Sequence, residues 1–506
     1  MVVCESRPHR EVQGRAPKMN ERGKSDRSVV PEKLPNKADN DAAEVVEERD
    51  RAKGSPSERD KPWTLSQSGL PSALERVGQA ARQDRRLRFT ALLHHIYDED
   101  RLRGAYMAIE HDAAAGIDGE TWKHYGENLR ENLQDLSGRL ARGAYRARPV
   151  RRVYIEKADG RKRPLGVPVL EDKIVQRSVV EVLNAIYEKD FLGFSYGFRA
   201  GRNPHQALDA VAYGMWKKMV KWVLDADIQS FFDTISHEWL VKFLEHRIAD
   251  QRMIRLIQKW LNAGVLEDGK RKVSEIGTVQ GGSISPLLAN IYLHYVFDLW
   301  IEQWRSKQAK GDVIVVRFAD DFVVGFQHRR EAERLLEELR ERLAQFGLKL
   351  HPDKTRLIEF GRFAAQDRQH RGDGKPETFN FLGFTHCCGS DQRGKFTVIR
   401  KTMRQRLVTK LKAVSLELRK RRHQPVDEQG RYIQAVVRGH VNYYGVPLNS
   451  RSIRVFRTLV IRLWKTWLSR RSQKGSVTWD RMQRYIERWV PPAVICHPYP
   501  SARFGG

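Results

Sequence analysis

The sequence predicts an α+β protein whose sheet carries helices on one face and is followed by a separate helical domain. Between residues 221 and 350, the predicted order is strand, helix, helix, hairpin, helix, strand, close to a ferredoxin-like split βαβ arrangement. The hairpin runs are almost purely apolar, which indicates a buried sheet. From about residue 400 the pattern becomes helical and strongly basic.

The N-terminal part divides into a tail and a helical region. Residues 1–62 are rich in charged residues, Ser and Pro and contain few large apolar residues. Such a composition cannot bury enough surface to fold, so we expect a disordered tail. Short helical patterns follow, including an amphipathic stretch at 89–109. Segment 166–187 predicts a turn and then a helix with these residues facing inward: Ile174, Val175, Val179, Val182 and Leu183.

The central elements follow from apolar spacing. Segment 221–235 predicts a short strand and a turn, and 237–248 predicts the next helix. Segment 281–300 opens with glycines, and Ser285 is expected to be the N-cap, with Pro286 as the first helical residue. Its predicted inward residues are Leu288, Ile291, Tyr292, Val296 and Leu299. The helix after the Asp320–Asp321 hairpin is expected to end at Gly347. Its predicted inward residues are Leu335, Leu336, Leu339, Leu343 and Phe346.

The charge of the chain points to a polyanionic partner. The net charge is +28 over 506 residues, and residues 396–506 alone hold 24 Lys and Arg against 5 Asp and Glu. Nucleic acid or an anionic membrane would fit this surplus. The sequence has no signal-peptide core and no run of 18 uncharged apolar residues, so we expect no membrane partner. Four cysteines without paired spacing favour a reducing, cytoplasmic location.

Two adjacent aspartates, Asp320 and Asp321, separate the apolar runs of VIVVRFADDFVVGF. One explanation is a plain hairpin turn, because Asp tolerates turn geometry. However, two carboxylates at the end of a packed sheet repel each other unless a proton or cation neutralises them. Asp227 also follows a short apolar strand and would lie beside them in a split βαβ sheet. Three such carboxylates suit two Mg²⁺ ions about 3.5–4 Å apart, although Asp225 and Asp233 are rival candidates.

Several segments resemble the motifs of reverse transcriptases in their usual order. They are DADIQSFFDTI (225–235), GTVQGGSISPLLANIYLH (277–294), FADD (318–321) and FLGF (381–384). Two others resemble the finger motifs of group II intron reverse transcriptases, namely RRVYIEKADGRKRPLGVP (151–168) and YGFRAGRNPHQAL (196–208). Residues 437–474 resemble the maturase domain of the same family.

The resemblance covers about residues 89–500 and implies a right-hand-like polymerase with fingers and a ferredoxin-like palm, followed by an α-helical thumb/maturase domain. The expected parts are an N-terminal extension with fingers (63–215), a palm (216–390), the maturase (X) or thumb domain (391–475) and a short basic nucleic-acid-binding segment (476–506). Many relatives carry an endonuclease domain with paired cysteines after this point, and we expect none here.

The resemblance also implies the catalytic residues. Asp227 and Asp320 would bind both Mg²⁺ ions, for which Mn²⁺ would substitute. Asp321 would be the weaker partner, and Ile228 would belong to the same metal site.

Further residues are implied to hold the nucleotide. Lys157 and Arg163 would grip the triphosphate of the incoming dNTP, although the neighbouring basic residues compete with Arg163 for this role. Phe232 would sit under the sugar and exclude a 2′-hydroxyl, unless Phe231 is the exposed one. Gln280 and the glycines after it would let the backbone approach the nucleotide. Lys354 would protonate the departing pyrophosphate or be an ordinary loop lysine.

The basic C-terminal region is expected to bind RNA. Most aromatic residues of this region are expected to be helix core. Tyr443 and Tyr444 are adjacent on a predicted helix and cannot both face inward, so they are expected to be exposed and to bind RNA. Four basic side chains are expected to neutralise phosphates: Arg454, Arg457, Arg462 and Lys465.

The implied function is an RNA-directed DNA polymerase that also binds its parent intron. Its expected partners are the intron RNA, an RNA template with a DNA primer, target DNA and dNTPs. The alternatives are an RNA-binding splicing factor with an unused polymerase site, and a domesticated reverse transcriptase in DNA repair or phage defence. Val279, Ser230 and Ala200 stand where the family commonly has Pro, Gly and Pro, and none of these departures removes a metal ligand.

Overall fold

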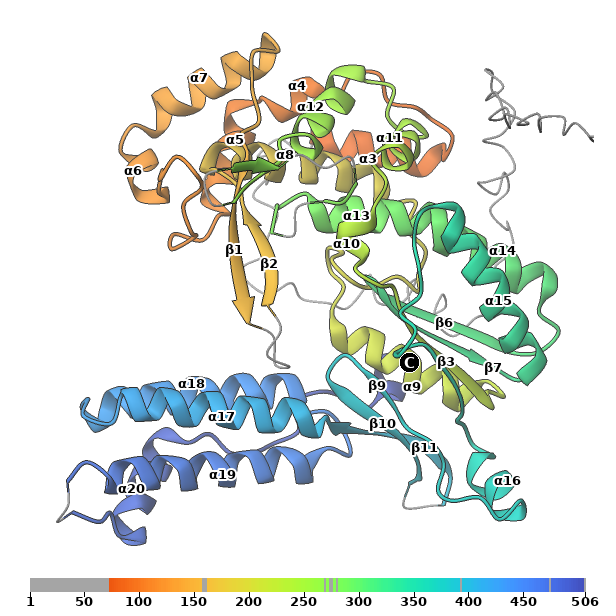
Figure 1. Cartoon of the computed structure of the whole chain (residues 1–506), viewed down its shortest axis with the longest axis vertical. Coiled ribbons are helices and arrows are strands. Elements are labelled where there is room, and N and C mark those ends of the chain that lie inside the picture. Colours follow the sequence, from red (N-terminus) through yellow and green to blue (C-terminus); the bar gives the residue numbers. More distant parts are fainter. Residues whose placement is uncertain are drawn as a thin grey trace, which may run out of the picture.

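Figure 1 shows the computed structural model of the chain. It consists of a helical N-terminal layer, a central sheet and a C-terminal helical arm that projects to one side. The structure describes residues 72–156, 162–267, 270–272, 276–278, 281–391, 394–472 and 475–504. The predicted tail over 1–62 lies outside these ranges. Within them, no helix is both long and apolar enough to cross a membrane.

The N-terminal layer packs short helices around the long helix α8 (Leu170–Tyr187). The others are α3 (Ala73–Gln83), α4 (Leu93–Ile96), α5 (Glu99–Met107), α6 (Trp122–Glu127), α7 (Leu129–Ala141), α11 (His237–Glu245) and α12 (Gln251–Leu261). All five inward positions predicted for the 166–187 helix are fully buried, because α3, α4 and α5 pack against it.

A small sheet with strand order β2-β1-β4-β5 extends from this layer. Its strands are β1 (Val150–Glu156), β2 (Lys162–Val167), β4 (Val265–Glu267) and β5 (Lys270–Lys272). The antiparallel hairpin of β1 and β2 points toward the C-terminal arm (Figure 1). This hairpin carries the predicted finger motif.

The central sheet has the strand order β6-β7-β3-β8, and all its neighbours are antiparallel. Its strands are β3 (Trp222–Asp227), β6 (Val313–Phe318), β7 (Asp321–Phe326) and β8 (Arg356–Glu359). The associated helices are α9 (Pro204–Lys217), α10 (Phe231–Thr234), α13 (Ser285–Leu293), the π-helical turn η1 (His294–Asp298), α14 (Leu299–Gln308) and α15 (Arg329–Gln345).

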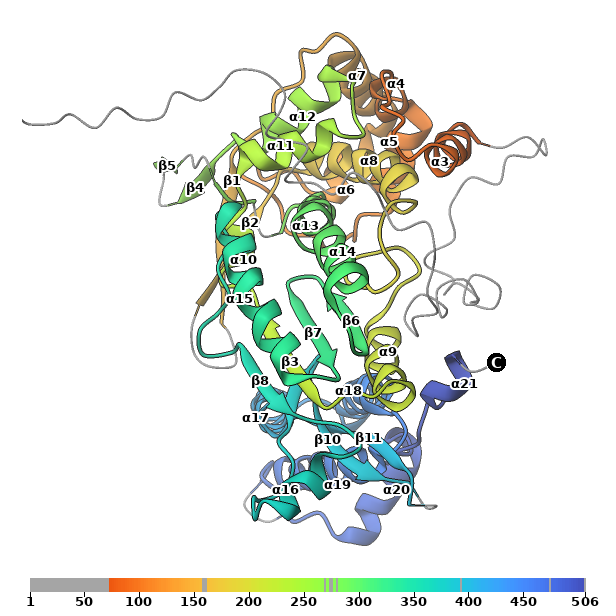
Figure 2. The same cartoon turned by 90° about the vertical axis from the view of Figure 1, so that its right-hand side faces the viewer.

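Both faces of the central sheet are covered, so the prediction of helices on one face is wrong. Leu224 belongs to the core shared with the α13–α15 helices, whereas its neighbour Val223 belongs to a second core with residues of α9. Figure 2 shows α9 and α15 on opposite sides of the strands. Alternate residues of each strand enter different cores, which explains why the runs are apolar throughout rather than alternating.

The helix predicted over 281–300 is longer and less regular than expected. All five predicted inward residues are buried, but Ser285 is the first helical residue and Ile284 takes the N-cap position. The helix continues to Gln308 through the π-helical turn η1. The predicted stop at Gly347 is confirmed, since α15 ends at Gln345 and Gly347 has a left-handed φ of 73°.

The C-terminal part begins with a second sheet and not with a helix. This sheet has the order β11-β10-β9, with β9 (Phe379–Phe381), β10 (Phe384–Ser390) and β11 (Phe396–Thr402), preceded by α16 (Ala364–His370). The arm that follows consists of α17 (Arg404–Lys420), α18 (Val426–Tyr444), α19 (Ser450–Ser469) and α20 (Trp479–Trp489). The predicted boundary at residue 391 therefore falls inside the β10–β11 hairpin, and the helices start at Arg404.

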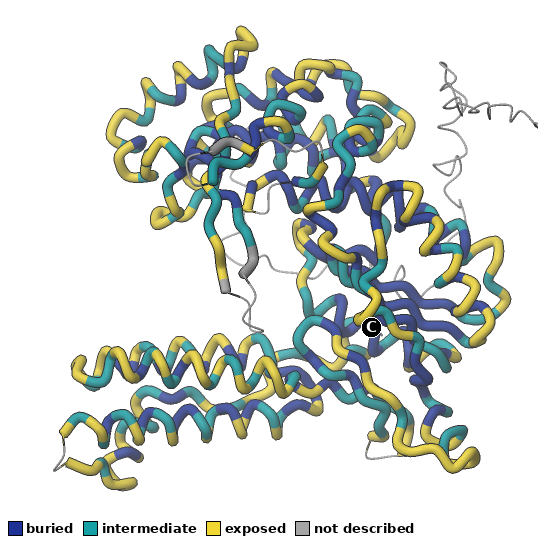
Figure 3. Tube along the Cα trace, viewed as in Figure 1, coloured by how far each residue is buried: buried dark blue, intermediate teal, exposed yellow. Residues whose placement is uncertain are grey.

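The arm has its own core but a largely exposed outer surface (Figure 3). The segment predicted to be a short basic nucleic-acid-binding stretch, 476–506, packs against the rest of the chain where it is described. Met482 of α20 is fully buried in the arm core, and α21 (Pro500–Phe504) returns to pack on α9. Arg503 Nε lies 3.0 Å from Asp209 Oδ2, so an ion pair fixes this return.

Candidate active site

Strand pairing brings the predicted carboxylates to one end of the central sheet. Asp227, the last residue of β3, lies directly opposite Asp321, the first residue of β7. Phe318 pairs with Asp321 across the β6–β7 hairpin, so Ala319 and Asp320 form a two-residue turn. Directly opposed residues of an antiparallel pair point to the same face. Asp227 and Asp321 therefore share a face, and Asp320 is beside them in the turn.

The local field at this end of the sheet is strongly negative. Burial raises the pKa of Asp321 well above its usual range, and the charges of Asp225, Asp227 and Asp320 raise it further. Burial also raises the pKa of Asp225 to about 6, while Arg356 opposes that shift. The rival candidate Asp225 thus belongs to the same cluster of aspartate side chains. Its Oδ2 lies 3.5 Å from Arg356 Nη2.

Asp233 and Ile228 have different positions from the three aspartates. Asp233 is exposed on the short helix α10. Ile228 has a side chain that is only 2% exposed and belongs to the apolar core, so only its main-chain oxygen could face a metal. The segment around Leu350 runs beside it, because His351 N donates to Asp227 O at 2.8 Å and Gln229 N donates to Lys349 O at 2.8 Å.

Lys354 is a second cation that faces the carboxylates, beside Arg356. Its Nζ forms an ion pair with Asp227 Oδ2, which the neighbouring 349–351 segment makes possible. Among the described residues, no three acidic, His or Cys side chains are arranged to enclose a metal ion. The donor set nevertheless fits a hard divalent cation, because several carboxylate oxygens meet where their mutual repulsion needs a positive charge.

The two adjacent phenylalanines have separate environments. Phe231 is 2% exposed and packs edge-on against Tyr292, 6.4 Å between ring centroids, whereas Phe232 is 9% exposed at the edge of the core. Phe232 O accepts a hydrogen bond from Thr278 N at 2.7 Å. Ser230 has a left-handed φ of 47°, which explains why a glycine would suit this position.

Three nucleotide-binding predictions concern Lys157, Arg163 and Gln280. Lys157 and Gln280 lie outside the described residues, as does the side chain of Arg163. The Arg163 backbone pairs with Ile155 in the hairpin. At its base, Gly281 has a φ of 114° and approaches Gly166 so closely that a Cβ would lie 2.5 Å from the Gly166 carbonyl oxygen. The glycine after Gln280 thus permits close contact between the loop before α13 and strand β2.

One buried residue of the site escaped the sequence interpretation. Arg317 is the only charged residue in β6, and its guanidinium is fully buried. It donates to the carbonyl oxygen of Ala319, directly before Asp320. The signal was present in the sequence, since one arginine interrupts the apolar run VIVVRF.

The expected exposure of Tyr443 and Tyr444 is wrong. Both are partly buried at the end of α18, and both pack on Phe384, with centroid distances of 5.8 and 5.0 Å. Tyr443 also donates its hydroxyl hydrogen to Leu382 O at 2.8 Å. Both adjacent helical residues are covered because the β9–β10 turn, with Leu382 and Phe384, packs against the end of the helix.

The four basic residues predicted to bind phosphates on α19 are not equivalent. Arg454 and Arg462 are exposed. Arg457 is partly buried, and its Nε donates to Pro491 O at 2.8 Å. Lys465 lies 5.0 Å from the ring centroid of Trp479. The last two side chains therefore hold the C-terminal segment, and the exposed pair remains available to a ligand.

Comparisons with known proteins define the class. Residues 155–386 match the family model described as reverse transcriptase (RNA-dependent DNA polymerase). The chain is 35% identical to protein YkfC of Escherichia coli (strain K12) over 310 residues, covering 55% of this chain and 81% of YkfC. It is 36% identical over 238 residues to the group II intron-encoded protein LtrA of Lactococcus lactis subsp. cremoris, covering 46% of this chain and 39% of LtrA. An uncharacterized 91 kDa protein in the cob intron of Schizosaccharomyces pombe is 36% identical over 222 residues, 43% of this chain and 27% of that protein.

The chain therefore belongs to the group II intron reverse transcriptase/maturase family. Its enzymatic activity is RNA-directed DNA polymerisation. The aligned segments span well under half the length of the two intron-encoded relatives.

Proposed function

We propose that the chain copies RNA into DNA by two-metal-ion nucleotidyl transfer at Asp227, Asp320 and Asp321, and that it binds its parent group II intron RNA to assist splicing and retromobility. The observation that carries the catalytic part is the register of β3 against β7. It sets Asp227 opposite Asp321 and next to the Asp320 turn, within the segment that matches the reverse transcriptase family.

The roles of the residues follow from their chemistry. Asp227, Asp320 and Asp321, with the main chain of Ile228, would hold two Mg²⁺ ions, or Mn²⁺ in their place. When bound, these cations neutralise the developing phosphate charge and lower the pKa of the primer 3′-hydroxyl. Lys354 is placed beside Asp227 by an ion pair, so its ammonium group can stabilise or protonate the departing pyrophosphate.

The remaining nucleotide contacts belong to the fingers and to the edge of the core. Lys157 and Arg163 would bind the triphosphate, and Gln280 would lie against the incoming nucleotide. The partners in this scheme are an RNA template with its DNA primer, dNTPs, target DNA and the intron RNA. The exposed basic residues of the arm support the RNA partner, because nucleic-acid affinity rests largely on phosphate contacts.

The proposed function is tested by primer extension and splicing with the full-length protein. An RNA template annealed to a DNA primer should be extended with dNTPs in Mg²⁺ or Mn²⁺ and not in EDTA. The same preparation should promote splicing of its parent intron RNA at an Mg²⁺ concentration too low for the RNA alone. Extension in EDTA would contradict the metal mechanism, and splicing that is indifferent to the protein would contradict the maturase part.

Sugar selection provides a prediction for Phe232. Phe232→Val should admit ribonucleotides at least about tenfold more readily, equivalent to about 1.4 kcal/mol of lost discrimination, because the side chain that meets a 2′-hydroxyl becomes shorter. The measurement is the ratio of kcat/KM for dNTP and rNTP. Phe231→Ala is the matched control and should cost about 3–5 kcal/mol of folding stability without changing that ratio. If only the Phe231 variant relaxes selection, the two roles are reversed.

A further inference from the structure

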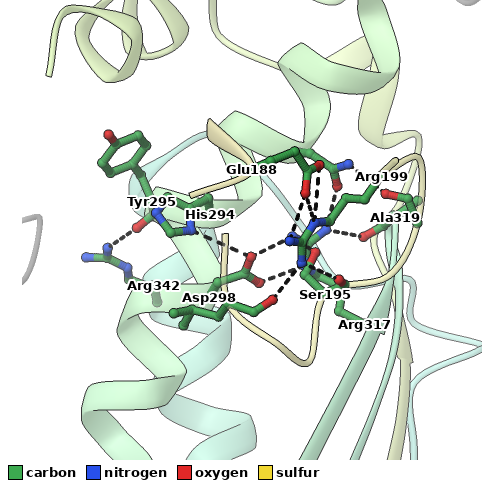
Figure 4. Close-up of polar contacts among 12 residues, drawn as sticks. Glu188, Ser195, Arg199, His294, Tyr295, Asp298, Arg317, Ala319 and Arg342 are labelled. Atoms are coloured by element: carbon green, nitrogen blue, oxygen red, sulfur yellow. Dashed lines mark hydrogen bonds and ion pairs between the residues drawn. The ribbon is translucent and has the colours of Figure 1, made fainter. Parts of the chain in front are cut away.

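Arg317 makes an unusually complete set of buried hydrogen bonds, shown in Figure 4. Its side chain is fully buried, and its Nε and Nη2 donate to the two carboxylate oxygens of Asp298 at 2.7 and 2.5 Å. Nη2 also donates to Ser195 Oγ at 2.7 Å, and Nη1 donates to Asn290 Oδ1 and Ala319 O, both at 3.0 Å. A guanidinium has five N–H donors, so every one of them has an acceptor.

The counter-charge comes from the π-helical turn. Asp298 is the last residue of η1 and is fully buried. The irregular turn is itself supported from α15, because Arg342 donates to Val296 O at 3.0 Å and to Tyr295 O at 3.1 Å. His294 Nδ1 lies 4.0 Å from Asp298, but burial lowers the pKa of His294 to about 3. Arg317 is therefore the cation that is hydrogen-bonded to both carboxylate oxygens of Asp298.

Among these acceptors, only the carbonyl oxygen of Ala319 belongs to the Ala319–Asp320 turn. The backbone of that turn has an unfavourable conformation. Ala319 has a left-handed φ of 58°, which costs a non-glycine residue about 1–2 kcal/mol. Such a conformation persists where surrounding contacts enforce it. The Arg317 guanidinium holds the carbonyl side of Ala319. On the other side, Gly197 lies so close that a Cβ would be 2.3 Å from Ala319 N.

We propose that Arg317, balanced by Asp298 and opposed by Gly197, is a positioning residue that fixes the Ala319–Asp320 turn and so sets the direction of the Asp320 carboxylate. The inference rests on the proposed metal-binding role of Asp320. Arg317 does not touch the reacting atoms; it acts through the Ala319 carbonyl. A residue that only stabilised the core would hold its four segments together without affecting how the site responds to metal.

The principal test is the double variant Arg317→Met/Asp298→Leu. Removing both charges avoids the unpaired buried ion that a single replacement would leave. We expect kcat to fall, or the Mg²⁺ concentration for half-maximal extension to rise, by about 10–100-fold, as is usual when a group that orients a metal ligand is lost. The Kd for template-primer should change less than about twofold. Arg317→Lys retains the charge without the planar fork and should give an intermediate shift.

The control is a comparable buried pair whose arginine donates to the main chain of Ala81, Asp84 and Leu87 and not to the Ala319–Asp320 turn. Arg247 Nε lies 2.9 Å from Asp190 Oδ2, and its Nη1 also donates to main-chain carbonyls. Arg247→Met/Asp190→Leu should alter Tm while leaving kcat and the Mg²⁺ requirement unchanged. If the Arg317 double variant changes Tm in the same way but keeps both kinetic quantities, the positioning role is overturned.

A second variant keeps the inference testable if the double variant does not fold. Gly197→Ala would press on the same turn at Ala319 N and should also raise the Mg²⁺ requirement. Gly374→Ala is its control, because nothing lies within 4 Å of an added Cβ there. An unchanged Mg²⁺ requirement in folded Gly197→Ala would overturn the inference. Asp320→Asn separates this outcome from failure of the proposed function, since activity in that variant would overturn the metal site itself.

Discussion

Asp320→Asn should abolish Mg²⁺-dependent cDNA synthesis while leaving affinity for RNA nearly intact. The amide is isosteric with the carboxylate but carries no charge, so it cannot balance a divalent cation. We expect a loss of about 10³-fold or more, equivalent to about 4 kcal/mol of transition-state stabilisation. Removing one negative charge from a site that receives a polyanion should slightly tighten RNA binding. Primer extension and filter binding on the same preparation measure both effects.

Two further variants sharpen this experiment. Asp227→Asn should be equally inactive, because Asp227 faces Asp321 across the strand pair. Asp233→Asn serves as the control, since that carboxylate is exposed on α10, and it should extend primers at a near-normal rate. Near-normal extension by Asp320→Asn would remove Asp320 from the metal site, whereas loss of RNA binding by all three variants would indicate a folding defect.

Neutralising the exposed basic residues of α19 should weaken RNA binding and reduce its salt dependence. The structure leaves Arg451, Arg454 and Arg462 exposed, and their spacing places them along one side of the helix. Each phosphate contact adds about 0.7–0.9 to the slope of log K against log salt. The triple Ala variant should therefore show a slope smaller by about two to three units. Arg457 and Lys465 are left unchanged because they hold the C-terminal segment.

The same variant should separate the two proposed activities. Splicing of the parent intron in low Mg²⁺ should fail before extension of a short pre-annealed primer does, because the carboxylates lie in the central sheet and not in the arm. The triple Arg→Lys variant is the matched control and should retain the salt slope, since the charges remain. If splicing and extension decline together with no change in slope, these arginines support the fold and do not bind RNA.

The sequence by itself determined the main elements of the central sheet and most of the acidic and basic residues of the site. The inward faces of α8 and of the α13–α14 helix follow from three- and four-residue spacing. Burial of one side of a helix requires apolar residues at this spacing in the sequence. The end of α15 at Gly347 follows from the conformational freedom of glycine. Charge next to apolar strands made the aspartates candidates, and the resemblance to reverse transcriptase motifs chose Asp227, Asp320 and Asp321 among them.

Only the tertiary structure decided which residues meet. The pairing of Asp227 with Asp321 is a register between strands far apart in sequence, and local spacing carries no information about register. Other contacts likewise depend on distant segments. The β9–β10 turn covers Tyr443 and Tyr444, and Arg457 donates a hydrogen bond to Pro491 O. The network of Arg317 joins residues 195, 290, 298 and 319. A buried arginine can only be satisfied by acceptors from several elements, so its partners appear when the fold is complete.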